Sequence, residues 1–599
     1  VYKRLRENQL KPAEERLSSL KVVFEASREV RMPILNSTLI IVACFLPLFF
    51  LSGMEGRMLI PLGIAFIVAL FASTVVALTL TPVLCSYMLT TKRALKQNEK
   101  EPFVSRTLKV WYKKALEWAL RYKKIVIGTS AALLIFTIVI MTGLGRSFLP
   151  PFNEGSLTIN ISTMPGVSLE ESDNMGRMAE EILLDIPEIQ TVARKTGRAE
   201  LDEHALGVNV SEMEAPFELD KRSRDEFLAD VRQRLGELKG VNIEIGQPIS
   251  HRIDAMLSGT KANIAIKLFG NDLNKLYNIG GQIKEAIQGI DGIADLTLEQ
   301  QIERPQLQIK PKRDMLAKYG IPLPKFSEFI NVALSGKVVS QVYEGGKVFD
   351  LTVKVHDDDK ANMEQIGNLM IDANGQKVPL HYVAEILPLV GPNTISRENV
   401  QRKIVVSANV AGRDLNGVVK DIQKTVGEQI TLPEGYHVEY GGQFESEQAA
   451  SRTLFLTSVI SILLIFLLLF NEFHSMPLSG IIMLNLPLAI IGGVLSIWFT
   501  SGIISIPAII GFISLFGIAT RNGILLVSHY NHLRSEGMSL HDSVVHGSLD
   551  RLNPILMTAL TSALALIPLA VGGDLPGNEI QSPMAQVILC GLLSSTLLD

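Results

Sequence analysis

Residues 511–530 read GFISLFGIATRNGILLVSHY, and this stretch determines how the rest of the chain is interpreted. It has about the 20 mostly apolar residues that a helix needs to cross a bilayer. Arg521 and Asn522 nevertheless lie in its middle. A guanidinium at that depth costs on the order of 3 kcal/mol on insertion scales, and such charges usually have a partner and a function. The stretch therefore predicts a membrane helix that carries a functional charge.

Apolar residues concentrate in three parts of the 599-residue chain, 34–89, 125–145 and 453–599. Within them, seven segments are long enough to span a bilayer, and an eighth begins near Met584. Residues 146–452 have the composition of a soluble protein. This distribution predicts a polytopic α-helical membrane protein with one large extramembrane region. The seven segments run over residues 35–53, 59–89, 125–145, 453–470, 476–499, 504–529 and 552–572.

The placement of Lys and Arg predicts the orientation of these helices. Residues 1–33 hold eight such residues and 90–124 hold eleven, so both segments are assigned to the cytoplasm. Counting crossings from there places 146–452 on the opposite side of the membrane. Residues 106–122 place apolar and aromatic side chains along one helical face and basic side chains elsewhere, which predicts an amphipathic helix in the inner interface. A plain cytoplasmic helix is the alternative.

The extramembrane region alternates between strand and helix patterns. The first unit, about residues 155–258, reads β-α-β-β-α-β, which is the split βαβ arrangement. A second unit of the same kind covers about 259–337 and 400–442. Residues 338–399 are Gly-rich with a shorter period and are interpreted as an insertion. We therefore expect two ferredoxin-like (βαββαβ) units, the second of them interrupted.

Several kinds of chemistry are absent from the sequence. It contains no G-x-x-x-x-G-K-[ST] motif, so ATP-driven transport by this chain is disfavoured. No nucleophile–base arrangement stands out, and the net charge of −4 does not suggest a nucleic-acid surface. We therefore expect neither an enzyme nor a nucleic-acid-binding protein.

Charge inside the membrane is the first candidate site. We expect Arg521 to face buried carboxylates that bind and release protons, because Arg itself does not titrate. Pairing with backbone carbonyls or extension to an interface is the alternative. The predicted spans contain no Asp or Glu, so the carboxylate is expected outside this sequence. Arg551 and Thr558 mark a second position, although Arg551 beside Asp550 is equally well explained as an interfacial charge.

An acidic, His-containing cluster in the extramembrane region is the second candidate site. Carboxylates with imidazole suit Zn²⁺, Co²⁺ or Ni²⁺, while a solvated loop is the alternative for any one of these residues. The cluster comprises Glu200, Asp202, Glu203, His204, Glu212 and Glu214, with His251 and Asp254 further along the chain.

Five motifs resemble those of RND (resistance–nodulation–division) efflux permeases, and they occur in the same order. They are LTPVLCSYML, FLPPFNEGSL, NLPLAIIGG, GFISLFGIATRNGILLV and RLNPILMTALTSALALIPLA. The resemblance implies a permease fragment whose first four membrane helices and first porter module are missing. Residues 1–33 would then follow the fourth helix, and 146–452 would be a periplasmic α+β porter module. It also implies a proton relay, which falls here on Arg521, Asn522, Arg551 and Thr558.

Two further stretches, TGRAELDEH and PISHRIDAMLSGTKANIAIKLFG, resemble the heavy-metal-efflux branch of that family. The copper and silver exporters of this branch use three methionines, whose positions we place at Asn160, Ala255 and Val338; only Met256 lies one place away. Because Cu(I) requires sulfur ligands, export of divalent cations is the favoured function. Export of Cu(I) or Ag(I), drug efflux, and a non-transporting receptor or export accessory are the alternatives.

The resemblance also implies partners and a location. We expect a homotrimer in the bacterial inner membrane of a Gram-negative cell, in contact with the lipid bilayer, a periplasmic adaptor protein and an outer-membrane channel. No cofactor is expected beyond the transported cation and protons. A cytoplasmic metal site is conceivable at four histidines, but a solvated loop is favoured there. They are His529, His532, His541 and His546.

Overall fold

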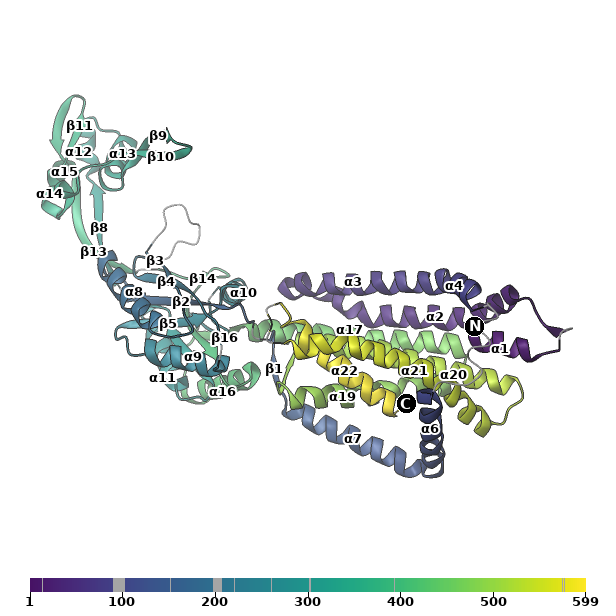
Figure 1. Cartoon of the computed structure of the whole chain (residues 1–599). Helices are drawn as coiled ribbons and strands as arrows, with labels where there is room; N and C mark the ends of the chain where they lie inside the picture. The colour runs from purple at the N-terminus through teal and green to yellow at the C-terminus, as the bar shows by residue number, and fades with distance from the viewer. Residues whose placement is uncertain are drawn as a thin grey trace.

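The computed structural model shows a bundle of long helices, an α/β body at one end of it, and a smaller subdomain beyond that body (Figure 1). Both chain ends lie in the helical bundle. The structure describes residues 1–12, 15–89, 103–150, 152–197, 207–219, 221–259, 261–300, 303–392, 394–573, 575 and 577–598.

Eight helices of the described chain are long and apolar enough to cross a membrane. The seven predicted spans and the eighth near Met584 are all confirmed as helices, most of them several residues longer than predicted. The elements are α2 (Ser19–Phe45) with η2 (Leu46–Phe50), α3 (Gly53–Leu78) with α4 (Leu80–Met88), α7 (Lys123–Gly143), α17 (Gln443–Phe473), α18 (Met476–Met483) with α19 (Asn485–Phe499), α20 (Ile506–Ser535), α21 (Leu540–Val571) and α22 (Gln581–Leu598).

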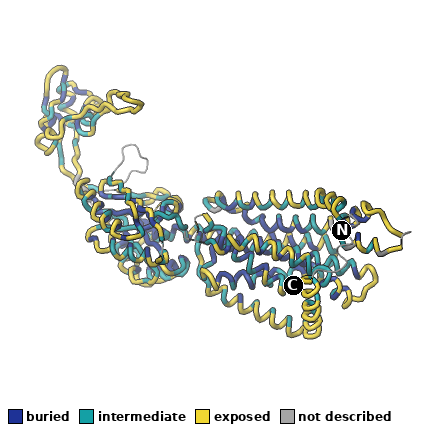
Figure 2. The backbone as a smooth tube through the Cα atoms, in the orientation of Figure 1, coloured by how far each residue is buried: buried dark blue, intermediate teal, exposed yellow. Residues whose placement is uncertain are grey.

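Prolines explain two of the breaks within these spans. The ring of a proline clashes with the carbonyl four residues earlier. Pro82 accordingly follows the end of α3 at Leu78, and Pro487 follows the end of α18 at Met483. The outward faces of α3 and α7 are exposed along much of their length (Figure 2), as expected for surfaces that contact lipid.

The predicted amphipathic helix is α6 (Phe103–Arg121). It runs across the axis of the bundle beside one end of α7 (Figure 1). Trp111 and Trp118 are 75 % and 55 % exposed, and the Asn553 Nδ2 amide donates a hydrogen bond of 2.7 Å to Ser105 Oγ. This contact attaches α6 to α21 and leaves its aromatic side chains available to a membrane surface.

The first extramembrane unit has the predicted order of elements. Its antiparallel sheet has the strand order β3-β4-β2-β5, and α8 and α9 pack on one face of it. The hydroxyl of Ser223 and the carboxylate of Glu226 form a capping box that begins α9. The elements are β2 (Ser156–Thr163), α8 (Leu169–Leu184), β3 (Ala193–Thr196), β4 (Val210–Pro216), α9 (Arg224–Leu235) and β5 (Val241–Gly246).

The second unit repeats this arrangement, with β7 and β6 on either side of β15, and β16 on the far side of β6. Gly442 adopts a positive φ of 93° at the end of β16, and α17 begins at the next residue. The sheet therefore leads directly into a membrane helix. The elements are β6 (Ile264–Phe269), α11 (Leu273–Ile287), β7 (Ile293–Leu298), β14 (Arg397–Glu398), β15 (Gln401–Val410), α16 (Leu415–Gln429) and β16 (His437–Gly442).

The insertion is longer than the sequence predicted. Strand β8 (Glu303–Pro311), which the prediction placed in the second unit, pairs instead with β13 (Ala384–Pro392) in a two-stranded arm. The insertion thus runs over 303–392 rather than 338–399, because strand pairing depends on contacts distant in sequence. Its other elements are α12 (Arg313–Lys318), α13 (Leu323–Leu334), β9 (Lys337–Glu344), β10 (Lys347–Val353), η3 (Asp357–Lys360), α14 (Met363–Asn368), β11 (Met370–Ala373), β12 (Gln376–Pro379) and α15 (Leu380–Val383).

Candidate functional site

The sheet of the first unit has one apolar and one polar face. Leu157, Ile159 and Ile161 of β2 point into the apolar core, so the alternate residues of β2 line the other face. The strand register places four polar residues in one row across this second face. They are Lys195 of β3, Glu212 of β4, Asn160 of β2 and Glu244 of β5. We call this set the polar row.

Lys261 lies over the centre of the polar row. Its Nζ atom is 2.5 Å from Glu212 Oε2 and 3.1 Å from Asn160 Oδ1. Lys195 Nζ approaches the other carboxylate oxygen, Oε1, at 2.7 Å. Burial raises the pKa of Glu212, but the hydrogen bonds and charges of the two lysines outweigh burial and hold that pKa below its usual value. Glu212 is therefore an anion that two ammonium groups neutralise.

His251 covers the end of the polar face. It lies on α10 (Pro248–Ser258), whose first backbone N–H groups donate to the Glu154 carboxylate, Ile249 N–H at 2.6 Å. The imidazole packs so closely on Gly246 that a Cβ atom there would lie 2.0 Å from His251 Nε2. Burial, and secondarily the charge of Lys261, lowers the pKa of His251 to about 4. The ring is therefore neutral, and neither nitrogen has a hydrogen-bond partner among the described residues.

Asp254, one turn further along α10, is 1 % exposed. Its oxygens accept hydrogen bonds from Gln443 Nε2 at 2.7 Å and from Asn263 Nδ2 at 3.1 Å. Burial raises its pKa to about 6, and the two amides only partly counteract that effect. Asp254 thus ties α10 to the first residue of membrane helix α17.

The other predicted metal ligands do not complete this cluster. Glu214 lies on the same face of β4 but is exposed, and the Met256 side chain is 64 % exposed. Within the described ranges, no three or more His, Cys, Asp or Glu side chains are grouped closely enough to hold a metal ion. Four predicted ligands lie outside the described residues. They are Glu200, Asp202, Glu203 and His204.

The placement of the three methionine positions was wrong. Asn160 lies in the polar row and Ala255 on α10, but Val338 is an exposed residue of β9 in the distal insertion. Three ligands of one ion must lie together, and these do not (Figure 1). The structure instead brings Lys261 to Asn160 and Glu212. This contact could not be anticipated from the sequence, because Lys261 lies in the connection between the two units.

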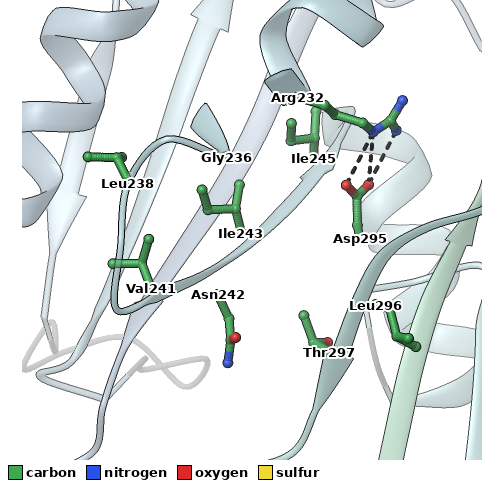
Figure 3. A pocket seen from close by; sticks show the side chains of 10 residues that line it. All are labelled: Arg232, Gly236, Leu238, Val241, Asn242, Ile243, Ile245, Asp295, Leu296 and Thr297. Atoms are coloured by element: carbon green, nitrogen blue, oxygen red, sulfur yellow. Dashed lines mark hydrogen bonds and ion pairs between the residues drawn. The ribbon is translucent and has the colours of Figure 1, made fainter. Parts of the chain in front are cut away.

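A cavity of about 260 Å³ separates β5 of the first unit from β7 of the second (Figure 3). On one wall, Arg232 Nε donates to Asp295 Oδ1 at 3.2 Å. Nearby, Thr297 Oγ1 of the second unit donates to Glu244 Oε1 at 3.0 Å. The end of the polar row is therefore joined to the second unit by a hydrogen bond.

In the membrane bundle, Arg521 lies midway along α20, next to the 2 % exposed Asn522. No hydrogen bond or ion pair joins Arg521 to another residue in the described part of the chain. Thr558 is exposed, and its hydroxyl donates to the Ile555 carbonyl of its own helix at 2.8 Å. Within the described residues, no hydrogen bond joins Arg521 to Thr558, and the proposed relay stays a prediction.

One carboxylate in the bundle was missed by the sequence analysis. Helix α17 extends to Phe473, three residues past the predicted span, so Glu472 falls in its last turn. Its side chain is half-buried and accepts a hydrogen bond from Asn36 Nδ2 of α2. The missed signal was the continuation of the helix through Asn471 and Glu472 after the apolar run ended.

The four histidines at 529, 532, 541 and 546 do not form one site. His529 Nε2 lies 3.4 Å from Asp550 Oδ2, and His532 Nε2 lies 3.3 Å from Glu536 Oε1. His541 and His546 are exposed elsewhere on α21. Each of the first two histidines thus pairs with a different carboxylate, in separate contacts.

A profile of the AcrB/AcrD/AcrF family matches residues 1–599. The chain belongs to this family. As an AcrB/AcrD/AcrF protein, it has the fold of the RND permeases, which are transporters rather than enzymes. The resemblance to RND permeases and to their heavy-metal-efflux branch is confirmed.

Its relatives include metal-resistance proteins. The chain is 33 % identical to the cobalt-zinc-cadmium resistance protein CzcA of Cupriavidus metallidurans, over 96 % of this chain and 55 % of CzcA. It is 26 % identical to the cation efflux system protein CusA of Escherichia coli, over 97 % and 56 %. The crystal structure of a heavy metal efflux pump matches with a TM-score of 0.79 and 26 % identity, over 97 % of this chain and 59 % of that one. The chain thus spans a little over half the length of these proteins.

Proposed function

We propose that this chain is part of a proton-driven permease that exports heavy-metal cations, with divalent cations such as Zn²⁺, Co²⁺, Ni²⁺ or Cd²⁺ as its substrates. In this proposal the two extramembrane units are ferredoxin-like units of a periplasmic porter module. The metal-resistance functions named for its relatives support a cation as substrate. The polar face of the first unit supports a divalent one.

The observation that carries the proposal is the set of ligands on that face. Glu212 of β4 and the neutral His251 imidazole of α10 both belong to the polar face, and carboxylate with imidazole is a ligand set for divalent transition metals. The thioether sulfur atoms of the neighbouring methionines are directed away from this face. Met213 is fully buried in the apolar core, on the opposite face of β4, and Met256 is exposed. Since Cu(I) and Ag(I) select thioether or thiolate ligands, this arrangement favours divalent cations.

The membrane bundle supports the proton-driven part of the proposal. Arg521 is a mid-membrane cation to which the described residues offer no counter-charge. Such a charge requires compensation, and we assign that role to a carboxylate of the full-length protein. Asn522, Arg551 and Thr558 are proposed to belong to the same relay. By analogy with the family, the full-length protein is a homotrimer in the inner membrane of a Gram-negative cell and works with a periplasmic adaptor and an outer-membrane channel.

Metal binding by the purified full-length protein tests this function. We expect Zn²⁺ or Co²⁺ to bind with a micromolar or lower Kd, and Glu212→Gln to weaken that binding. Cells that express the protein should gain resistance to the same ions. Selective binding of Ag⁺ would instead indicate a monovalent exporter. Resistance to lipophilic drugs without metal binding would indicate a drug pump, and metal binding without proton-coupled transport would indicate a receptor or accessory protein.

A further inference from the structure

Several buried polar groups gather on the polar face of the first unit and at the N-cap of α10. Within the described residues, Thr158 Oγ1, Asn160 Nδ2, Gln247 Nε2 and both ring nitrogens of His251 lack hydrogen-bond partners. All four side chains are at least nine-tenths buried. Buried polar groups normally have partners, so a face that gathers several without partners is a binding site rather than a core.

Lys261 already occupies the anionic centre of this site. Its ammonium takes one oxygen of Glu212 and the amide oxygen of Asn160, which are hard ligands that a metal cation would use. Its charge also acts on the His251 imidazole and on the Glu244 carboxylate. An arriving cation therefore meets a positive charge within the site and must compete with it for the same oxygens.

We propose that Lys261 is a built-in competitor of the transported cation. A divalent cation binds by displacing the Lys261 ammonium from Glu212 and Asn160, and the returning ammonium promotes release of that cation. Lys261 thereby sets the affinity of the site for divalent cations. This proposal rests on the proposed function.

The side chain of Lys261 is suited to such an exchange. It is 30 % exposed, whereas Glu212 is 13 % exposed, so the ammonium lies near the edge of the site and its carboxylate partner lies inside. A lysine has a flexible four-carbon stem and a strongly hydrated head, so the ammonium can move into solvent without disturbing the backbone. No covalent step is involved, and the charge that leaves Glu212 is replaced by the charge of the metal ion.

Lys195 provides a matched control within the same site. Its ammonium binds the other oxygen of Glu212 at 2.7 Å, but its side chain is 66 % exposed. Its charge is not among those that shift the pKa of His251, whereas the charge of Lys261 is. The two lysines thus bind the same carboxylate, but only the ammonium of Lys261 lies within the proposed binding site.

The test compares Zn²⁺ binding by the purified full-length protein with that by its Lys261→Met and Lys195→Met variants, using isothermal titration calorimetry in detergent. We expect Lys261→Met to tighten the Kd by at least about tenfold, because a like charge is removed from the site. Lys195→Met, whose charge is solvated, should tighten it by no more than about threefold. Lys261→Arg should restore a Kd close to that of the original protein.

Transport supplies a second readout. In proteoliposomes, Lys261→Met should lower both KM and kcat for Zn²⁺, because tighter binding slows release. A Kd for Lys261→Met equal to or weaker than that of the original protein would overturn the proposal, and Lys261→Gln distinguishes that result from misfolding because it retains a hydrogen-bond donor. If the original protein and every variant fail to bind Zn²⁺, the proposed function itself fails.

Discussion

Buried charges are paired in the extramembrane body, whereas a buried charge in the membrane bundle is not paired among the described residues. In the body, Glu212 is neutralised by two lysines, Asp295 by Arg232, and Lys267 by Glu398, all within this chain. In the bundle, Arg521 has no such partner among the described residues. The difference shows that the polar row is neutralised within this chain, whereas the described residues leave the charge of Arg521 uncompensated.

The largest effect is expected at Arg521. We expect Arg521→Ala in the full-length protein to reduce metal resistance to that of cells without the transporter, because the relay loses its fixed cation. Arg534→Ala is the control, since Arg534 lies on the same helix but is exposed at its end. Resistance is measured as growth on Zn²⁺, with the amount of protein in the membrane checked by immunoblot. Resistance that survives Arg521→Ala would show that Arg521 has a structural role only.

The next largest effect is expected at Glu212. Glu212→Gln should weaken Zn²⁺ binding by roughly 10–100-fold, because it removes the anion of the polar row. Glu214→Gln removes a carboxylate from the same face of the same strand, but at an exposed position, and should change the Kd far less. Equal effects of the two substitutions, measured by calorimetry, would mean that general negative charge rather than the polar row attracts the ion.

The buried carboxyl group of Asp254 makes the stability of the extramembrane body depend on pH. Its pKa of about 6 is above the ordinary aspartate value of 3.8, so the folded protein binds more protons than the unfolded chain between these values. Stability therefore decreases as pH rises from about 4 to about 6. The Asp254→Asn variant does not lose stability in this way. Its free energy of unfolding, relative to that of the original protein, should therefore increase by roughly 3 kcal/mol between about pH 4 and about pH 6. Thermal unfolding of both proteins in detergent at pH 4 and pH 7 measures this difference. A difference in stability that does not change with pH would contradict the raised pKa of Asp254.

The smallest effect is expected at Gly246. A methyl group there meets the His251 ring, so Gly246→Ala should displace the imidazole at a cost of about 1–2 kcal/mol in stability and should also weaken Zn²⁺ binding. Gly281→Ala on α11 is the control, since a Cβ at that helical position meets nothing within 4 Å. Its Tm should be unchanged or slightly higher. If Gly246→Ala left both the Tm and the Kd unchanged, His251 would not be fixed by this contact.

Much of the architecture could be predicted because it follows from local patterns. Apolar runs of membrane length mark the eight long helices, and prolines such as Pro82 mark where they break. Alternating strands and capped helices likewise predict the order of elements in both extramembrane units. The pairing of β8 with β13 could not be predicted, because it joins segments more than 70 residues apart and β8 reads as an ordinary strand.

The candidate site was only partly predictable for the same reason. The acidic alternation at Glu212 and Glu214 and the histidine at 251 are visible in the sequence as ligand types. Their relation to Lys261 is not, because it depends on the connection between units folding back over the first sheet. The placement of Val338 was wrong because counting positions along the chain into an insertion does not show which residues lie close together in space.

The junction at Gly442 has a mechanical consequence. Strand β16 and helix α17 meet without a linker, so the 31-residue helix acts as a lever about 46 Å long, with one end held in an extramembrane sheet. A tilt of roughly five degrees about its membrane end would carry Gln443 through about 4 Å. Because Gln443 holds Asp254, that displacement would reach the helix that carries His251. Helix α17 is therefore a rigid connection between the membrane bundle and α10. Through it, a change of charge in the bundle would move α10 and open or close the polar face.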